Sequence, residues 1–326
     1  MIAWILAAGL AHAIQVSGKD IACPVGGGTA RVYTRVTNNA AGGYDSDLAS
    51  YSAGGQWRAY RVATCKPSQL TLFGTDMEVG VPTARQAAVT AATQKAVAAL
   101  PNPADPALWE RYGLAVAAYE ALGKDDVFLG DLWVEASWTA RDAAIGYYEN
   151  LQGPKAARAL VDAGRGELAK PLSVADRKKV LYNLARVAHR GGFHDERDGF
   201  LTQFEKAGPL ETRETKALTT FRTIAREVEP ALQDKAIARY TAALRGQLAH
   251  DEKVRVTYVL ADLLRRRGRA RDALPLYFLV ANDTQAREDL RGMALFLADA
   301  LATQLDPGVK RPAGTPTSTT APKPTK

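Results

Sequence analysis

Most of this chain consists of segments with helical periodicity, which proline and glycine separate from one another. From Thr83 onward, apolar residues recur every three or four positions and strong helix formers prevail. The breaks fall at Pro101, Pro103, Pro106, Gly153-Pro154, Pro171, Gly191-Gly192, Pro209, Pro230 and Gly268. The pattern predicts helices near residues 83–100, 107–122, 126–150, 154–168, 174–190, 194–207, 211–227, 230–246, 251–267, 270–282 and 286–304. Short links between helices favour antiparallel pairs, so we expect a mainly α fold over residues 83–307.

Three stretches of this helical part share the spacing of small and large residues that tetratricopeptide units need for close helix packing. The best begins at Val254 and places Gly268 at the turn and Tyr277 in the second helix. A second unit begins at Lys178, and a weaker one begins at Ala217. We therefore predict a tetratricopeptide-like helical repeat domain, whose concave groove binds peptides or partner proteins. The alternative is a bundle of the same helices without an exposed groove.

The preceding residues, 14–82, have the pattern of a small β-rich module. Residues 30–36 and 57–62 alternate between apolar and polar side chains, as half-buried strands do. Glycine pairs at Gly42-Gly43 and Gly54-Gly55 predict turns or loops between them.

The only two cysteines of the chain, Cys23 and Cys65, lie in similar turns within this module. A zinc ribbon has a second cysteine three residues after each, but Gly26 and Ser68 occupy those positions here. Two thiolates make a poor structural zinc site, so we predict no metal and no cofactor. In a zinc ribbon the first cysteines of the two turns face each other. A Cys23–Cys65 disulfide is therefore expected in an oxidising compartment.

The order of these motifs carries a resemblance to a known family. It is borne by the stretches Cys23-Pro24-Val25-Gly26, Tyr44-Asp45-Ser46-Asp47, Trp109-Glu110-Arg111-Tyr112 and Leu132-Trp133-Val134-Glu135-Ala136-Ser137-Trp138. Together with the second cysteine turn, they resemble the bacterial family catalogued as domain of unknown function 2225, over roughly residues 20–170. The resemblance implies a zinc-ribbon-like module followed by a tetratricopeptide-like helical region, and it implies no enzymatic activity. The family's second cysteine in each turn is missing here.

The two ends of the chain differ from the rest in composition. Residues 1–13 form a short apolar run that closes on a small-x-small pattern, which predicts a secretory signal peptide cut after Ala13. The alternative is a buried N-terminal strand or helix. Residues 308–326 are rich in threonine, proline and lysine without large apolar side chains, which predicts a disordered tail. Its basic charge suits a weak attachment to an anionic envelope surface.

More than half of the net charge of +7 lies in the tail, residues 308–326. Four of the positive charges lie in the tail, at Lys310, Arg311, Lys323 and Lys326. The rest of the chain is therefore only about +3 (seven minus four), which is too little to indicate nucleic-acid binding.

The densest charge feature of the helical part is a run of arginines around the turn at Gly268. We interpret it as a candidate partner-binding patch for an acidic peptide, a phosphate or a lipopolysaccharide; its members are Arg265, Arg266, Arg267, Arg269 and Arg271. The alternative is a solvated turn, in which cations stabilise the C-terminal end of a helix.

No arrangement of nucleophile, base and acid stands out, so we predict no catalytic residue. The group His194-Asp195-Glu196 has the chemistry of a divalent-ion site, although such clusters are usually solvated helix N-termini. The sequence thus favours a non-enzymatic interaction or scaffold protein of the bacterial cell envelope, periplasmic or secreted, with a protein or peptide partner. Two alternatives are an intracellular zinc-ribbon-type regulatory protein and an enzyme with a site between its domains.

Overall fold

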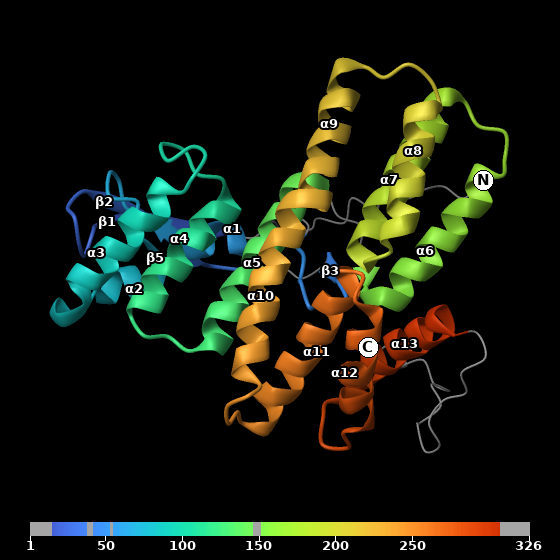
Figure 1. Cartoon of the computed structure of the whole chain (residues 1–326). Helices are drawn as coiled ribbons and strands as arrows, with labels where there is room; N and C mark the ends of the chain where they lie inside the picture. The colour runs from blue at the N-terminus through green and yellow to red at the C-terminus, as the bar shows by residue number, and fades with distance from the viewer. Residues whose placement is uncertain (1–14, 38–41, 53–54, 146–150, 307–326) are drawn as a thin grey trace. The chain divides into compact units, whose positions relative to one another are not determined.

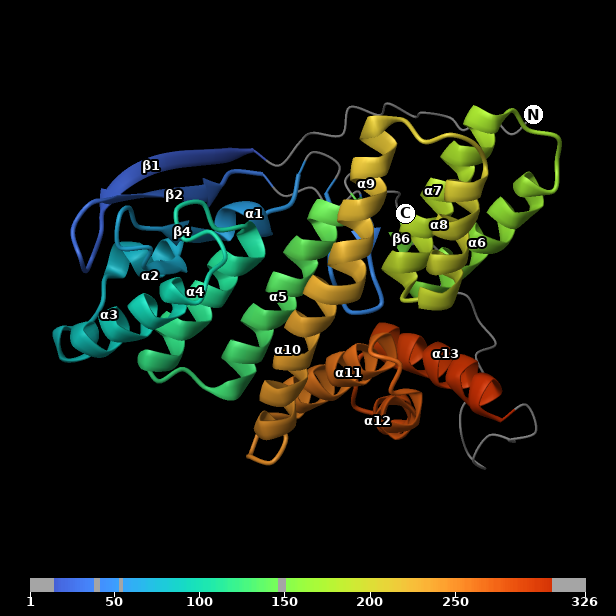
Figure 2. The same cartoon turned by 45° about the horizontal axis from the view of Figure 1, so that its top comes forward.

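A computed structural model describes residues 15–37, 42–52, 55–145 and 151–306 (Figures 1 and 2). The expected signal peptide, 1–13, and the expected tail, 308–326, lie outside these residues. The described residues form two compact units. Of the described residues, the first unit contains 15–37, 42–44, 50–52, 55–125 and 135–145, and the second contains 45–49, 126–134 and 151–306.

The prediction of a mainly helical fold is confirmed. All eleven expected helices are present, and their ends agree with the proline and glycine breaks to within a few residues. They are α3 (Thr83–Ala98), α4 (Leu108–Ala121), α5 (Asp126–Ile145), α6 (Gly153–Leu168), α7 (Val174–Gly191), α8 (His194–Lys206), α9 (Thr212–Thr223), α10 (Glu229–Ala243), α11 (His250–Arg266), α12 (Ala270–Asn282) and α13 (Glu288–Leu305).

The break expected at Pro230 is absent. A π-helical turn, η1 (Ile224–Val228), joins α9 to α10, and the helix runs on through the proline (Figure 1). Proline lacks the N–H that an α-helix needs at this position, and its ring clashes with the carbonyl four residues earlier. The wider π turn directly before Pro230 relieves both problems, so the helix is not interrupted.

The first unit contains the strand that the alternation of residues 30–36 predicts. The strand predicted over residues 57–62 is wrong, because residues 58–61 form a short helix and only Val62 begins a strand. Strands β1 (Val16–Ala22) and β2 (Thr29–Arg35) form an antiparallel hairpin, and β4 (Val62–Thr64) pairs with β5 (Thr71–Phe73). The remaining short elements are α1 (Arg58–Arg61), α2 (Gly74–Val79), β3 (Gly43–Tyr44) and β6 (Leu151–Gln152). Alternate residues of β2, Ala30 and Val32, are buried, which gives the hairpin one face toward the core and one toward solvent (Figure 2).

The expected domain boundary at residues 82 and 83 falls inside the first unit. Helix α4 packs directly on the β4–β5 pair: the Phe73 N–H donates to the hydroxyl of Tyr119, with N and O 2.9 Å apart. Arg111 of the same helix donates to the side chain of Thr64 and the carbonyl of Val62. These contacts join the first helices to the strands, although the chain changes its periodicity at this point.

In the second unit, five pairs of helices that follow one another in sequence pack against one another. Contacts join α6 to α7, α7 to α8, α10 to α11, α11 to α12 and α12 to α13. Helix α13 also touches α6. No helix in the described part of the chain is long and apolar enough to cross a membrane.

Five residues of the second unit come from far earlier in the sequence. Asp45–Ala49 belong to it, whereas the residues on either side belong to the first unit. We call these five residues the acidic turn. The apolar part of the second unit's core contains Val256, Leu260 and Leu263 of α11, and every residue of the acidic turn except the half-buried Leu48 is as deeply buried as they are.

Candidate functional site

One face of α11 carries four polar side chains that a helix brings together. Tyr258, Asp262, Arg265 and Arg266 follow at spacings of three and four residues, which place them on the same side of the helix. Asp262 and the side chain of Arg266 are fully buried, and the side chain of Arg265 is 7% exposed. Buried charges are stable only when groups of opposite charge or hydrogen-bonding groups surround them.

The carboxylate of Asp262 is surrounded by hydrogen-bond donors. Its Oδ1 accepts from Arg265 Nε at 3.0 Å and from the hydroxyl of Tyr277 at 2.7 Å. Its Oδ2 accepts from Arg266 Nε at 2.8 Å and from the hydroxyl of Ser46 at 3.0 Å. Burial opposes ionisation of Asp262, but the charges of Arg265 and Arg266 outweigh it and hold the pKa of this carboxyl well below its usual range. The aspartate is therefore ionised in the folded protein.

The acidic turn has a closed backbone geometry of its own. The N–H of Leu48 donates to the carbonyl of Asp45 at 3.1 Å, and the N–H of Asp45 donates to the carbonyl of Ala49 at 2.9 Å. Leu48 has a φ of 68°, in the left-handed region that closes such turns. The turn thus presents three consecutive polar side chains, Asp45, Ser46 and Asp47, none of which is more than 2% exposed.

Each of these three side chains meets an arginine. Asp45 Oδ1 accepts from Arg190 Nε at 2.7 Å. The hydroxyl of Ser46 accepts from the guanidinium groups of Arg265, at 2.9 Å, and Arg266, at 2.7 Å. The carboxylate of Asp47 lies 3.7 Å from Arg266 Nε. The second unit therefore binds this turn with three arginines, and matches each charge of Asp45, Asp47 and Asp262 with one of opposite sign.

Main-chain carbonyls of the acidic turn and of the end of α7 also take part in the site. The hydroxyl of Tyr258 donates to the carbonyl of Ser46 at 2.7 Å, so the backbone of the turn is recognised as well as its side chains. Arg266 also donates to the carbonyls of His189 and Arg190. Arg265 donates to those of Gly191 and Gly192. These carbonyls end α7, where the helix dipole favours cations.

Gly192 is required where α7 ends beside Arg265. Its φ of 71° is left-handed, and an added Cβ would lie 2.6 Å from a guanidinium nitrogen of Arg265. We expect Gly192→Ala to lower the free energy of unfolding by more than about 1 kcal/mol, because it adds backbone strain and displaces that arginine. The control is Gly199→Ala in α8, where a Cβ meets nothing within 4 Å and alanine is the better helix former. Urea denaturation of both variants checks this; equal destabilisation would contradict it.

The structure divides the five arginines that the sequence singled out. Arg265 and Arg266 face inward and bind the acidic turn. Arg267 forms a surface ion pair with Asp234, and Arg269 forms one with Asp272. Arg271 is exposed. The five residues are therefore not one surface patch: the first two belong to the buried site, and the other three lie around the turn at Gly268.

A second group, which the sequence did not single out, adjoins this site. His189 Nε2 lies 2.8 Å from a carboxylate oxygen of Glu229, and both side chains are 2% exposed. Arg197 approaches His189 Nδ1 at 3.2 Å. Since arginine only donates, Nδ1 is the acceptor and Nε2 carries the proton that Glu229 accepts. Glu229 directly follows the π turn η1, so that turn helps to position the carboxylate.

His194 makes the same region sensitive to pH. Burial, together with the charge of Arg197, holds the pKa of His194 well below its usual value. The unfolded chain, with a histidine pKa of about 6.5, therefore binds a proton more readily than the folded one. We expect the free energy of unfolding to fall as the pH drops below about 6.5, and this dependence to weaken in His194→Gln. Thermal unfolding from about pH 7.5 to about pH 5 measures it; an unchanged slope in the variant would count against it.

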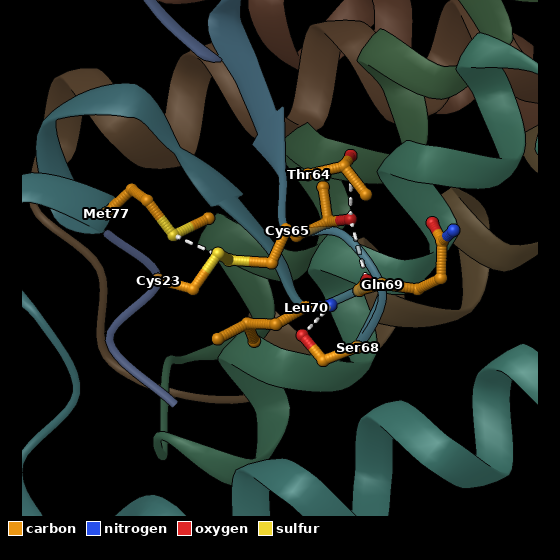
Figure 3. Close-up of a disulfide and its surroundings, with 8 residues drawn as sticks. Cys23, Thr64, Cys65, Ser68, Gln69, Leu70 and Met77 are labelled. Carbon is orange, nitrogen blue, oxygen red and sulfur yellow. Dashed lines mark hydrogen bonds between the residues drawn. A yellow bond between two sulfur atoms is a disulfide. The ribbon is translucent and has the colours of Figure 1, made fainter. Parts of the chain in front are cut away.

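The disulfide expected from the sequence is present. Cys23 and Cys65 are bonded, with their Cα atoms 5.8 Å apart (Figure 3). The positions where a zinc ribbon has its other two cysteines also meet: a Cβ added to Gly26 would lie 2.9 Å from the Cβ of Ser68. The two turns thus pair the corresponding ligand positions of a zinc ribbon, Cys23 with Cys65 and Gly26 with Ser68, although only the first pair holds sulfur.

The group His194-Asp195-Glu196 does not form an ion site. Its Glu196 binds Arg158 and Arg165 instead. Within the described residues, no three histidine, cysteine or acidic side chains are placed to hold a metal together.

Comparison with known proteins adds no relative. No family model matches the chain, and neither the curated proteins nor the solved structures contain a significant match.

Proposed function

We propose that this protein is a non-enzymatic interaction or scaffold protein, whose second unit recognises an acidic peptide turn. One observation carries the proposal: the unit already holds such a turn, Asp45–Ala49, with Arg190, Arg265 and Arg266. The packing of α7 against α8 and of α11 against α12, the helix pairs of the units expected from Lys178 and Val254, supports the tetratricopeptide-like arrangement, in which peptide binding is the usual role. The unit expected from Ala217 is not a helix pair, because α9 continues through η1 into α10.

The contacts select a conformation as well as a charge. Arginines bind carboxylates and hydroxyls with fixed geometry, so the spacing of Asp45, Ser46 and Asp47 is recognised. The hydroxyl of Tyr258 donates to the main-chain carbonyl of Ser46, in the middle of the turn. A peptide with the sequence Asp-Ser-Asp in a closed turn satisfies all of these contacts. An extended acidic peptide satisfies only the charge requirement.

The resident turn acts as a competitor for this site. It comes from a loop whose flanking residues belong to the first unit, and the side chains of Asp45 and Ser46 hold it through hydrogen bonds. A partner engages the same arginines by offering a turn of its own that displaces the resident one. Only a partner that matches both charge and shape overcomes the local concentration of the resident turn.

A peptide of residues 44–50 tests the proposal directly. Fluorescence anisotropy would compare its binding to the full chain and to the variant Asp45→Asn/Asp47→Asn, which weakens the resident turn. We expect the variant to bind at least about tenfold more tightly than the parent chain, because the competitor is impaired. Adding Arg190→Met to the variant should reduce this binding.

Two controls make the result decisive. A peptide with asparagine in place of both aspartates should bind the variant more weakly than the acidic peptide. If the variant unfolds, the acidic peptide added in trans should raise its melting temperature, whereas the asparagine peptide should not. Equal binding of both peptides, or no effect of the acidic peptide on the variant, would overturn the proposal.

A location in the bacterial envelope, periplasmic or secreted, is part of the same proposal. The Cys23–Cys65 bond supports it, because disulfides persist in oxidising compartments. The pattern of residues 1–13 supports export. N-terminal sequencing of the protein from its native cells should begin at Ile14; an intact Met1 would contradict export. The tail, 308–326, is proposed to add a weak attachment to anionic envelope surfaces.

The resemblance to the domain of unknown function 2225 family remains a proposal as well. Two pairings support it, that of Cys23 with Cys65 and that of Gly26 with Ser68, since these are the ligand positions of the family's paired cysteine turns. In this chain the disulfide takes the place of the metal.

A further inference from the structure

Three sulfur atoms meet at the cysteine turns of the first unit. Cys23 follows β1, Cys65 follows β4, and Met77 lies in α2. The Met77 Sδ is 3.7 Å from the Cys65 Sγ, and Figure 3 shows the methionine side chain directed at the disulfide. Cys65 and Met77 are buried, at 0% and 2% exposure, while Cys23 is half-exposed. The spacing of the cysteines in the sequence does not reveal this third sulfur.

We propose that these three sulfurs bind one copper(I) ion when the disulfide is reduced. Two thiolates and a thioether form a soft ligand set, which selects copper(I). Zinc is disfavoured because its structural sites use four ligands, and Gly26 and Ser68 supply no further sulfur.

The distances suit a three-coordinate ion. Three sulfurs in a triangle around an ion, each at about 2.3 Å from it, stand about 4 Å from one another. The separation of Met77 Sδ and Cys65 Sγ, 3.7 Å, is already close to that value. Once the disulfide is reduced, the two cysteine sulfurs must separate to the same spacing, which small rotations of their side chains provide.

The cysteine turns are held by backbone contacts that do not involve the sulfur–sulfur bond. The N–H of Cys23 donates to the carbonyl of Gly28 at 3.0 Å, and that of Cys65 donates to the carbonyl of Leu70 at 2.8 Å. A further bond, from the N–H of Lys66 to the carbonyl of Thr29, links the two turns to each other. After reduction these contacts keep both thiols beside Met77, so the ligand set is preorganised.

The reduction requires an external dithiol. The bond between the sulfurs of Cys23 and Cys65 breaks, each sulfur takes one proton from the dithiol, and the dithiol becomes a disulfide. Copper(I) then displaces the two thiol protons, which pass to solvent, and binds both thiolates together with the sulfur of Met77. Of the two cysteines, Cys23 is the less buried residue, so we expect the dithiol to attack there.

The test is a copper(I) titration of the full chain, reduced with dithiothreitol, freed of reductant and kept anaerobic. Bicinchoninate serves as the competing chelator. We expect one copper per reduced chain and none in the oxidised chain. In Met77→Leu, a substitution of similar volume, the affinity should fall by about tenfold or more, since even an indirect partner of a metal costs that much when it is lost. X-ray absorption should count three sulfur neighbours in the parent chain and two in the variant.

Several results would overturn the site. Copper bound equally well with leucine at position 77 would show that the cysteines alone hold it. If reduction unfolds the chain, the cysteines are no longer held beside Met77. The Met77→Leu variant would then bind copper as the parent chain does, and this result would also exclude the site. Failure of the reduced chain to bind copper, or binding by the oxidised chain, would also exclude it.

Discussion

Replacing Asp262 with asparagine is expected to lower the free energy of unfolding by about 3–5 kcal/mol, which is the effect of breaking a buried ion pair. The substitution removes the negative charge that Arg265 and Arg266 share, and leaves both guanidinium groups buried with less compensation. It keeps the size of the side chain, so the loss reports charge rather than volume. Urea denaturation followed by circular dichroism measures it.

A surface pair in the same unit provides the matched control. Asp234→Asn breaks the ion pair with Arg267, whose side chain is 29% exposed. We expect this variant to lose no more than about 1 kcal/mol, because water and salt screen exposed charges. If both variants lost the same free energy of unfolding, the buried ion pairs of Asp262 would contribute no more to stability than the exposed pair does.

The stability from Asp262 should also depend on pH in a defined direction. Its pKa in the folded protein lies below the unfolded value of about 3.9. The contribution is therefore complete above about pH 4 and is lost as the pH falls toward the lower, folded pKa. In Asp262→Asn this part of the acid sensitivity should disappear.

Removing the disulfide is expected to have an effect of similar size. The bond joins residues 42 positions apart, and closing a loop of that length restricts the unfolded chain by about 4 kcal/mol in the chain-entropy model. Cys23→Ser/Cys65→Ser should therefore unfold at a markedly lower urea concentration. Since the bond lies in the first unit, the lost free energy of unfolding should appear in the urea transition of that unit.

Two comparisons separate loop closure from local packing. Met77→Leu changes the contact with Cys65 but keeps the bond, and should cost less than about 1.5 kcal/mol. Dithiothreitol should destabilise the parent chain about as much as the double substitution does, and should leave the serine variant unchanged. A parent chain that dithiothreitol does not destabilise would refute the assignment of this stability to the bond.

The helices could be predicted because their signals are local. Proline, glycine and apolar periodicity lie within each segment, and all eleven helices follow them. The one wrong break, at Pro230, also has a local cause, since a π turn accommodates the missing N–H. The pairing of Cys23 with Cys65 could be predicted as well, because the chain offers no other cysteine.

The candidate site could be predicted only in part. The sequence singles out Arg265 and Arg266 and indicates an acidic peptide as one possible ligand, but not its source. Ser46 and Asp262 are 216 residues apart, and no local pattern specifies a contact at that separation. Asp45, Ser46 and Asp47 stand out in the sequence only through the family resemblance. His189 and Glu229 escape prediction because each is an ordinary helix residue until the fold joins them.

The long separation between the acidic turn and α11 has a consequence for the order in which the protein acquires its structure. During synthesis, residues 45–49 emerge early, whereas Asp262, Arg265 and Arg266 follow only after more than 200 further residues. Such non-local contacts form late, since much of the chain must already be in place. Until then the arginines of α11 stay hydrated and the early loop stays unbound. The nascent chain therefore exposes both halves of this site at a stage when each is open to capture by other molecules.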